Sequence, residues 1–124
     1  MNILKRWVLL HHTYGRDAVS HNHFDLLLED QDGCRTWRLD SIPVIDGMEV
    51  PVKQAPIHKL EWLDRIESAV SGNRGWARRV ERGTFSGLLP ASQNYPIVVN
   101  LFSKSISGRL VIRDSACRIF SIKA

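Results

Sequence analysis

The amino-acid sequence predicts a mainly β fold: a compact antiparallel β-barrel with one or two short helical segments. Residues 23–29 place Phe24, Leu26 and Leu28 on one face of a strand, because successive side chains of a strand point to opposite faces. The remainder of the chain divides into short apolar segments separated by Gly, Pro, Asn and Asp. Many short strands with regular turn signals are typical of a barrel or sandwich and not of an α/β fold.

The first third of the chain predicts three strands. Residues 5–12 are apolar and end in polar groups, as in a buried strand, and residues 13–22 have the glycine and polar residues of a loop. The second strand, 23–30, and the third, 34–39, are joined by a segment with an Asp-Gly pair, which favours a tight hairpin turn.

The middle of the chain is expected to be less regular. Residues 40–57 contain three prolines and a glycine, which predicts an irregular segment. Residues 57–66 have apolar side chains at helix-like spacings, but over a length that allows only one or two helical turns. Residues 71–75 contain two glycines and predict a tight loop. The further expected strands are 76–81, 84–88, 96–102, 107–112 and 117–122.

Composition narrows the class of protein. The chain has 124 residues, of which 44% are hydrophobic and 24% charged, as in one soluble domain with its own core. Cys34 and Cys117 form no CxxC pair, so a zinc knuckle and a dithiol redox motif are excluded. The N-terminal apolar run is too short for a signal peptide, and no stretch approaches the ~20 apolar residues of a membrane span. We therefore expect a cytoplasmic protein with no membrane partner.

The charge is modest in total but uneven. The formal net charge is +4, and residues 74–82 contain four arginines. Such a segment favours a polyanionic partner such as nucleic acid. A solvated strand face is the alternative interpretation.

The second face of the 23–29 strand predicts a metal site. His23 and Asp25 are about 6–7 Å apart along this strand, so both side chains can reach one divalent ion. Two more histidines, His11 and His12, end the preceding strand. Two histidines and one carboxylate suit manganese, iron or zinc, and such an ion can activate water and polarise a phosphoryl oxygen. The alternative is a polar strand face exposed to water.

Five segments occur in an order that adds to this interpretation. They are Trp7-Val8-Leu9-Leu10-His11-His12, the His-x-Asp-Leu-x-x-Glu strand from His23 to Glu29, Arg35-Thr36-Trp37-Arg38-Leu39, His58 with Trp62, and the glycine-bearing segment from Val70 to Gly75 with Glu81-Arg82-Gly83-Thr84. This ordered set resembles the 3′-phosphoesterase domain of bacterial DNA ligase D, especially its small stand-alone relatives. The resemblance covers about residues 7–85.

The resemblance implies one phosphoesterase-like barrel domain over residues 1–124 that processes DNA 3′ ends in repair, removing a 3′-phosphate or a 3′-terminal ribonucleotide. It implies a nucleic-acid 3′ end, in DNA or a DNA/RNA primer-template, as the substrate, and a ligase or polymerase as a candidate protein partner. The implied ion is Mn²⁺, with Zn²⁺ or another divalent ion as the alternative. Its ligands carry over to His12, His23 and Asp25, where His12 aligns better than His11. The catalytic histidine carries over to His58.

The expected substrate contacts are Trp62, Lys53 and Arg38. Three features depart from the family pattern. Leu27 stands where the family has a phosphate-contacting arginine, and Trp62 stands where it typically has a tyrosine. The basic phosphate clamp that precedes the lone histidine is represented only by Lys53. These departures favour, as an alternative, a nucleic-acid-binding barrel without catalysis. A second alternative is a small non-haem iron oxygenase, since a His-x-Asp pair followed by a distal histidine, here His23, Asp25 and His58, is also the pattern of that class.

Overall fold

Nine β-strands and one short helix make up the regular structure that the computed structural model describes, over residues 4–14, 22–72, 74–91 and 96–122. In chain order these elements are β1 (Lys5–Thr13), β2 (His23–Glu29), β3 (Cys34–Leu39), β4 (Val50–His58), the 3₁₀ helix η2 (Leu60–Leu63), β5 (Glu67–Ala69), β6 (Trp76–Ser86), β7 (Ile97–Phe102), β8 (Gly108–Arg113) and β9 (Ala116–Phe120).

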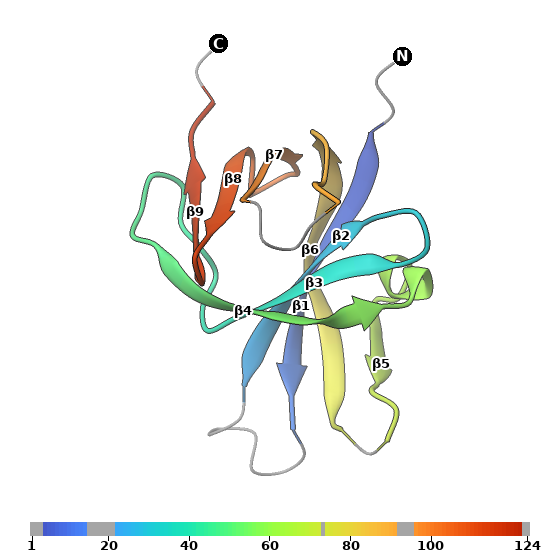
Figure 1. Ribbon diagram of the computed structural model, residues 1–124. Helices are drawn as coiled ribbons and strands as arrows, with labels where there is room; N and C mark the ends of the chain where they lie inside the picture. Colours follow the sequence, from blue (N-terminus) through green and yellow to red (C-terminus); the bar gives the residue numbers. More distant parts are fainter. Residues whose placement is uncertain (1–3, 15–21, 73, 92–95, 123–124) are drawn as a thin grey trace.

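The nine strands form one sheet that closes on itself (Figure 1). Their order is β1-β2-β3-β4-β9-β8-β7-β6-β5, and β1 also pairs with β6, so the sheet returns to its first strand. Every pairing between the described strands is antiparallel. The predicted fold class, a mainly β antiparallel barrel with a short helical segment, is therefore confirmed. Closure of this kind pairs backbone N–H and C=O groups that would otherwise be unpaired at the edges of the sheet.

The segment 40–57, predicted to be irregular, instead contains most of β4. This strand follows β3 over most of its length but pairs with β9 only at Val50 and Pro51. Next to this short pairing, the Val52 amide donates a hydrogen bond to the Ser115 carbonyl, at 2.9 Å. Beyond it β4 is an edge strand, where a proline such as Pro56 is tolerated. The prediction was wrong because it treated the prolines as strand breakers.

Residues 76–86 form one strand, β6, and not the two strands predicted on either side of Arg82-Gly83. Gly83 is paired with Trp7 of β1. A Cβ atom at Gly83 would collide with the carbonyl of Phe102 and lie 2.8 Å from the Trp7 indole nitrogen. The glycine thus allows a close approach of neighbouring chain segments inside a continuous strand, and it does not mark a turn.

Two smaller segments complete the comparison with the predicted elements. Of residues 57–66, only Leu60–Leu63 is helical, as a single 3₁₀ turn. Glu67–Ala69 forms a short strand, β5, that the sequence pattern did not indicate. The predicted loop 13–22 lies mostly outside the described residues. In the described part of the chain, no helix has the length and apolar composition needed to cross a membrane.

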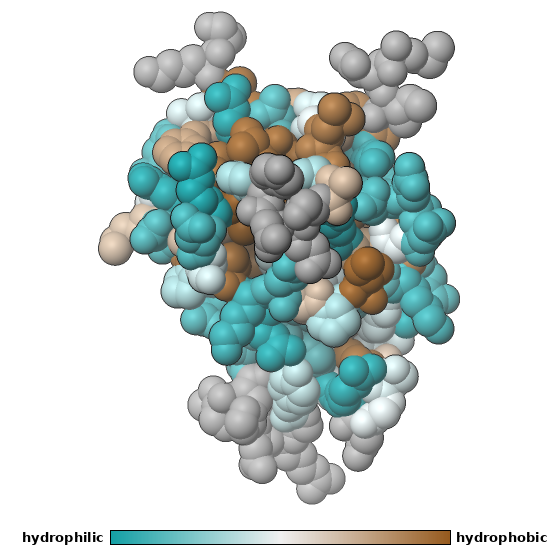
Figure 2. Space-filling model, viewed as in Figure 1, coloured by the Kyte–Doolittle hydropathy of each residue, from teal (hydrophilic) through white to brown (hydrophobic). Residues whose placement is uncertain are grey.

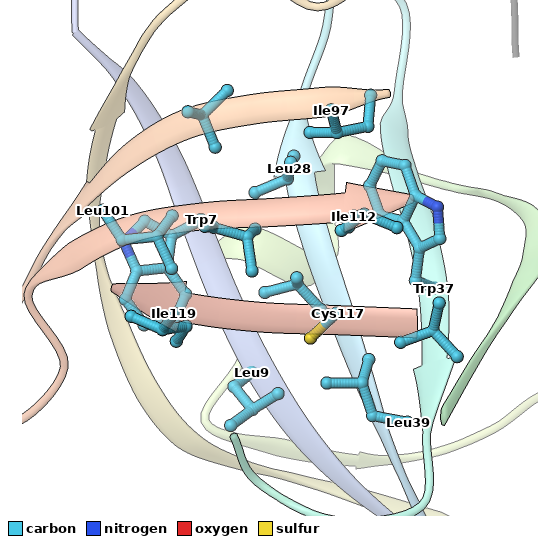
Figure 3. Packing of buried hydrophobic residues seen from close by; sticks show 14 of the residues in the cluster. Trp7, Leu9, Leu28, Trp37, Leu39, Ile97, Leu101, Ile112, Cys117 and Ile119 are labelled. Atoms are coloured by element: carbon cyan, nitrogen blue, oxygen red, sulfur yellow. The ribbon is translucent and has the colours of Figure 1, made fainter. Parts of the chain in front are cut away.

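The main core lies inside the ring (Figure 3) and receives side chains from β1 to β4 and from β6 to β9. Leu26, Leu28 and Trp37 are buried there, and Phe24 packs against them, as the alternation predicted. Burial of each such large apolar side chain stabilises the fold by about 1.5–3 kcal/mol.

A second, smaller core lies on the outer face of β1, β2, β3 and β6, under η2. We call it the outer core. Its buried members are Val8, Leu10, Leu27, Cys34, Trp62, Leu63 and Ala77. β1 and β2 are therefore buried on both faces, because η2 covers their outer side. The ligand candidates lie on this same outer face.

Candidate metal centre

The pairing of β1 with β2 brings His12, His23 and Asp25 onto one face. His12 lies directly opposite His23, and Asp25 lies opposite Leu10. Directly opposed residues of an antiparallel pair share a face, as do residues two apart on one strand. The three side chains therefore project from the same outer face, beside the outer core.

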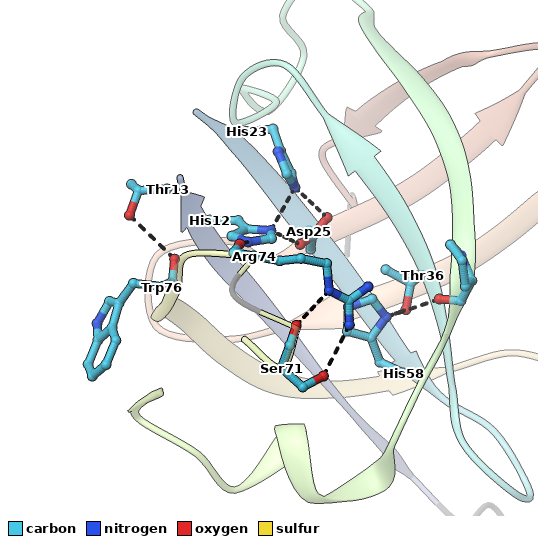
Figure 4. A network of polar contacts seen from close by, with 10 residues as sticks. His12, Thr13, His23, Asp25, Thr36, His58, Ser71, Arg74 and Trp76 are labelled. Atoms are coloured by element: carbon cyan, nitrogen blue, oxygen red, sulfur yellow. Dashed lines mark hydrogen bonds and ion pairs between the residues drawn. The ribbon is translucent and has the colours of Figure 1, made fainter. Parts of the chain in front are cut away.

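The three side chains converge on one point (Figure 4). His12 Nδ1 is 3.1 Å from His23 Nε2 and 3.5 Å from Asp25 Oδ2, and His23 Nε2 is 3.2 Å from Asp25 Oδ1. Ligand atoms bound at about 2.0–2.2 Å from one ion lie about 2.8–3.6 Å apart at octahedral or tetrahedral angles. All three residues are buried, with 4–7% of their surface exposed. This His-His-Asp cluster could hold a metal ion, as expected from the sequence.

A backbone carbonyl sets the orientation of the His12 ring. His12 Nε2 lies 2.7 Å from the carbonyl oxygen of Arg74. Because a carbonyl oxygen only accepts hydrogen bonds, Nε2 carries the proton, and in the neutral ring Nδ1 keeps its lone pair toward His23 and Asp25. A ligand histidine is usually held in this way by a partner on its second nitrogen.

The loop that supplies this carbonyl is packed closely against the end of β1. The Arg74 guanidinium donates to the backbone oxygen of Ser71, at 2.7 Å, and to its hydroxyl, at 3.1 Å. Gly75 has φ of +93°, and a Cβ atom there would collide with the backbone of Thr13 and Tyr14. A glycine at this position satisfies both requirements. The predicted tight loop at 71–75 therefore belongs to the site, in the part of it that the structure describes.

Asp25 is prepared to act as a carboxylate ligand. Burial by itself would raise the pKa of this side chain, but the contacts that the His12 and His23 rings make with its oxygens, together with the nearby imidazoles of His23 and His58, outweigh it. The pKa of Asp25 is consequently held well below its usual range. The group is ionised across the neutral pH range, which is the form that binds a cation.

His58, the predicted catalytic residue, lies at the end of β4 beside the cluster. Its Nδ1 is 3.0 Å from both the Thr36 hydroxyl and the Pro56 carbonyl. The Thr36 hydroxyl donates its own proton to the Cys34 carbonyl, so it accepts one from His58. Nδ1 of His58 is therefore protonated, and Nε2 is the nitrogen that can take up or release a proton. His58 is near enough to contribute to the lowered pKa of Asp25, although it is outside the group of converging ligand atoms.

Arg38 and Lys53 also lie on this face of the sheet. Arg38 is directly opposite Asp25, and Lys53 is directly opposite Arg38. Both side chains are exposed, and together with His23 and Tyr14 they line an open groove of about 780 Å³, the first groove. The positions that the sequence suggested for substrate binding thus border the cluster, while their contact with a substrate stays a prediction.

Trp62 has a structural position. It is 9% exposed and belongs to the outer core, and the Arg65 guanidinium lies 4.5 Å from the centre of its ring. Its ring meets that of His58 edge to face at 6.5 Å. Trp62 therefore packs beside the predicted catalytic histidine, and its contact with a substrate stays a prediction.

Two nearby residues point elsewhere. His11 lies on the opposite face of β1 from His12 and stacks on Phe24 at 4.9 Å. Leu27, at the position of the family's arginine, is fully buried in the outer core. His12 is therefore the histidine of this pair that joins the cluster, and Leu27 contributes packing.

The arginines of segment 74–82 do not share one surface. The Arg74 side chain folds onto Ser71, and Arg78 and Arg79 are adjacent on β6, so they point to opposite faces. By the register with β1, Arg79 lies opposite Leu10 and Arg82 lies opposite Val8, so these two share the outer face of β6 and Arg78 does not.

Sequence reasoning missed Tyr14 and the Arg74 carbonyl. The Tyr14 ring stacks on His12 at 4.5 Å and lies 5.6 Å from the ring of His23. Its position two residues after His12 could have indicated a shared face, since an extended chain alternates. No sequence pattern could have indicated the Arg74 carbonyl, because every residue has a backbone carbonyl whatever its side chain.

In comparisons with known proteins, no protein-family model and no curated protein sequence matches the chain. The resemblance to the ligase D phosphoesterases therefore remains a prediction from the ordered motifs.

Proposed function

We propose that this protein is a metal-dependent phosphoesterase that processes DNA 3′ ends, removing a 3′-phosphate or a 3′-terminal ribonucleotide. The observation that carries the proposal is the convergence of His12 Nδ1, His23 Nε2 and an Asp25 carboxylate oxygen within 4.8 Å of one another. The proposed ion is Mn²⁺, with Zn²⁺ or another divalent ion as the alternative, since imidazole and carboxylate ligands suit several of these metals.

Each neighbouring side chain has a proposed role. His12, His23 and Asp25 would hold the ion, which would supply Lewis-acid chemistry to a phosphoryl oxygen and to a bound water. Water would add to the phosphorus and lose a proton to the solvent as the bond from phosphorus to the 3′ oxygen breaks. His58, whose Nδ1 proton points to Thr36, would donate a proton from Nε2 to this leaving oxygen. Arg38 and Lys53 bind phosphate oxygens from the first groove. Arg38, opposite Asp25, thus supplies a cation near the cluster, where Leu27 supplies none.

The product of this reaction is a 3′-hydroxyl, which both DNA ligases and polymerases require. We therefore place the protein in cytoplasmic DNA repair, before a ligase or polymerase that uses the processed end. The substrates are DNA strands or DNA/RNA primer strands with a blocked 3′ end.

A primer strand ending in a 3′-phosphate tests the proposal. Incubation with Mn²⁺ is expected to release inorganic phosphate, and His23→Ala is expected to reduce the rate by about a thousandfold or more because a ligand is lost. His11→Ala is the matched control, since this histidine lies on the opposite face and stacks on Phe24. Absence of product with Mn²⁺ and with Zn²⁺, or equal rates for the two variants, would overturn the proposal.

The iron oxygenase remains a second candidate on one observation. Two histidines and one carboxylate are the ligands of the non-haem iron class. Here, however, His12 and not His58 joins His23 and Asp25. Oxygen consumption dependent on ferrous iron, without phosphate release, would support this candidate.

The other alternative, a nucleic-acid-binding barrel without catalysis, is favoured by a different observation. Leu27 is fully buried in the outer core, so a phosphate-contacting side chain is missing at this position. Oligonucleotide binding that weakens with salt, without product at saturating Mn²⁺, would support this reading.

A further inference from the structure

A second cleft adjoins the first groove on the side away from the metal cluster. It has a volume of about 540 Å³ and lies where β4 has separated from β9. Val52, Lys53 and Ser115 line both the first groove and the second cleft. The two are therefore neighbours with a shared wall, and this wall is the point where the Val52 amide bonds to the Ser115 carbonyl.

The second cleft has an excess of positive charge. Arg35, Lys53 and Arg113 line it, against one carboxylate, Asp114. Arg35 is already paired with Asp30 at 2.9 Å, whereas Arg113, which is exposed on β8, has no such ion pair with any residue that the structure describes. Where β4 crosses the front of the molecule, the surface is mainly hydrophilic (Figure 2). A polar, cationic lining of this kind is suited to an anionic ligand.

We propose that the second cleft binds the sugar-phosphate backbone of the single-stranded nucleotides that precede the processed 3′ end. This inference rests on the proposed function. With the 3′ end at the metal cluster, the strand can continue only in the 5′ direction. Lys53 lines both hollows and Arg113 lines the second, so a polyanion that crosses their shared wall would pass from one cation to the other.

The size of the cleft favours a single strand. Its volume is in the range of clefts that hold one small organic molecule, which is the scale of a nucleotide and well below that of a duplex. Proteins that bind single strands combine a cationic groove along the backbone with sequence-tolerant contacts. We therefore expect a preference for single-stranded or overhanging 3′ ends over blunt duplex ends.

Arg113→Ala is the variant that tests the second cleft. Arg109→Ala is its matched control: it removes the same charge from the same strand, but Arg109 lies at the opposite end of β8 and contacts Asn100. Both variants are assayed on a 3′-phosphorylated single strand of about 12 nucleotides and on a 3′-phosphorylated dinucleotide, which is too short to extend far beyond the first groove.

Arg113→Ala is expected to raise KM about fivefold for the long strand, with kcat and the dinucleotide reaction unchanged. It should also make the dependence of log KM on log salt shallower by about 0.7, the value for one phosphate contact on a single strand. Equal behaviour of the two variants on the long strand would overturn the inference, as would an equal loss on both substrates.

A binding titration separates this inference from the proposed function. Fluorescence anisotropy of the labelled long strand is measured with the full chain in Mn²⁺, with and without each substitution. If the protein releases no phosphate but Arg113→Ala still binds about fivefold more weakly than Arg109→Ala, the proposed function fails and the second cleft stands as a binding site. If phosphate is released and the two variants bind equally, the proposed function stands and the inference about the cleft fails.

Discussion

The two faces of the β1–β2 pair are both buried, yet they have different chemistry. The inner face contributes Leu9, Leu26 and Leu28 to the core of the ring. The outer face begins with apolar residues under η2 and ends with His12 and His23, which are as well shielded from water as several core residues. Burial alone therefore does not distinguish core from site in this protein.

The difference between the faces lies in how each compensates for burial. Apolar side chains gain stability by leaving water. Imidazoles and a carboxylate lose hydration and keep their place only because polar partners, such as the Arg74 carbonyl, replace the water. A cluster held in this way is already arranged for a cation, but it contributes less to stability than an apolar cluster of the same size. Substitutions on the two faces should therefore have separable effects.

The largest expected effect is on the inner face. Leu28→Ala should reduce the free energy of unfolding by about 2–5 kcal/mol, because it leaves a cavity in the core of the ring. The additional stabilisation produced by Mn²⁺ should be the same as in the unsubstituted protein. Urea unfolding with and without Mn²⁺ measures both quantities. A smaller Mn²⁺ increment in Leu28→Ala would show that the two faces are coupled.

The next effect is on the outer face. Mn²⁺ at about one hundred times its Kd should stabilise the protein by about 2.7 kcal/mol, since it binds the folded state. His23→Ala should abolish this increment, whereas His11→Ala, on the opposite face, should retain it. Thermal unfolding at fixed Mn²⁺ concentration provides the comparison. An increment that survives in His23→Ala would place the ion elsewhere.

A smaller effect concerns pH in the absence of metal. The folded-state pKa of Asp25 is lowered from an unfolded value of 3.8, so its contribution to stability is present above that value and is lost as pH falls through the folded pKa. Urea unfolding in EDTA, followed from about pH 5 downward, should show a steeper loss for the unsubstituted protein than for Asp25→Asn. Asp32→Asn, at an exposed turn position, is the control and should retain the steep loss.

The smallest effect concerns the orientation of His58. Thr36→Val removes the hydroxyl that accepts from His58 Nδ1, with little change in volume. We expect the unfolding free energy to fall by about 1 kcal/mol and kcat of the proposed reaction to fall about tenfold, with Mn²⁺ affinity unchanged. Ser68→Ala, which removes the hydroxyl of a partly exposed serine on β5, should change neither quantity. A loss of Mn²⁺ affinity in Thr36→Val would connect this contact to the metal cluster instead.

The local pattern of the sequence was sufficient for much of this structure. Alternation within residues 23–29 predicted that Leu26 and Leu28 face the core while His23 and Asp25 share the other face. Turn residues around the short apolar segments predicted the mainly β fold. These features depend on residues that are close in the chain, where the two-residue period of a strand is visible as alternating apolar and polar side chains.

Other features depend on contacts that no local pattern records. The prolines of β4 suggested an irregular segment, because nothing near them in the chain shows that the strand lies at an edge. Gly83 suggested a break, because the close approach of Trp7 and Phe102 comes from distant strands. Tertiary context overrides local preference at such positions.

By itself, the sequence determined the class of fold and the residue types able to bind an ion, because strand alternation and side-chain chemistry are local properties. Only the tertiary structure decided that His12 and His23 meet, that Leu27 is buried, and that a carbonyl 62 residues away orients the His12 ring. These outcomes depend on strand register and on what covers each face. Both are set by packing between segments far apart in the chain, where the free energy of burial outweighs local preference.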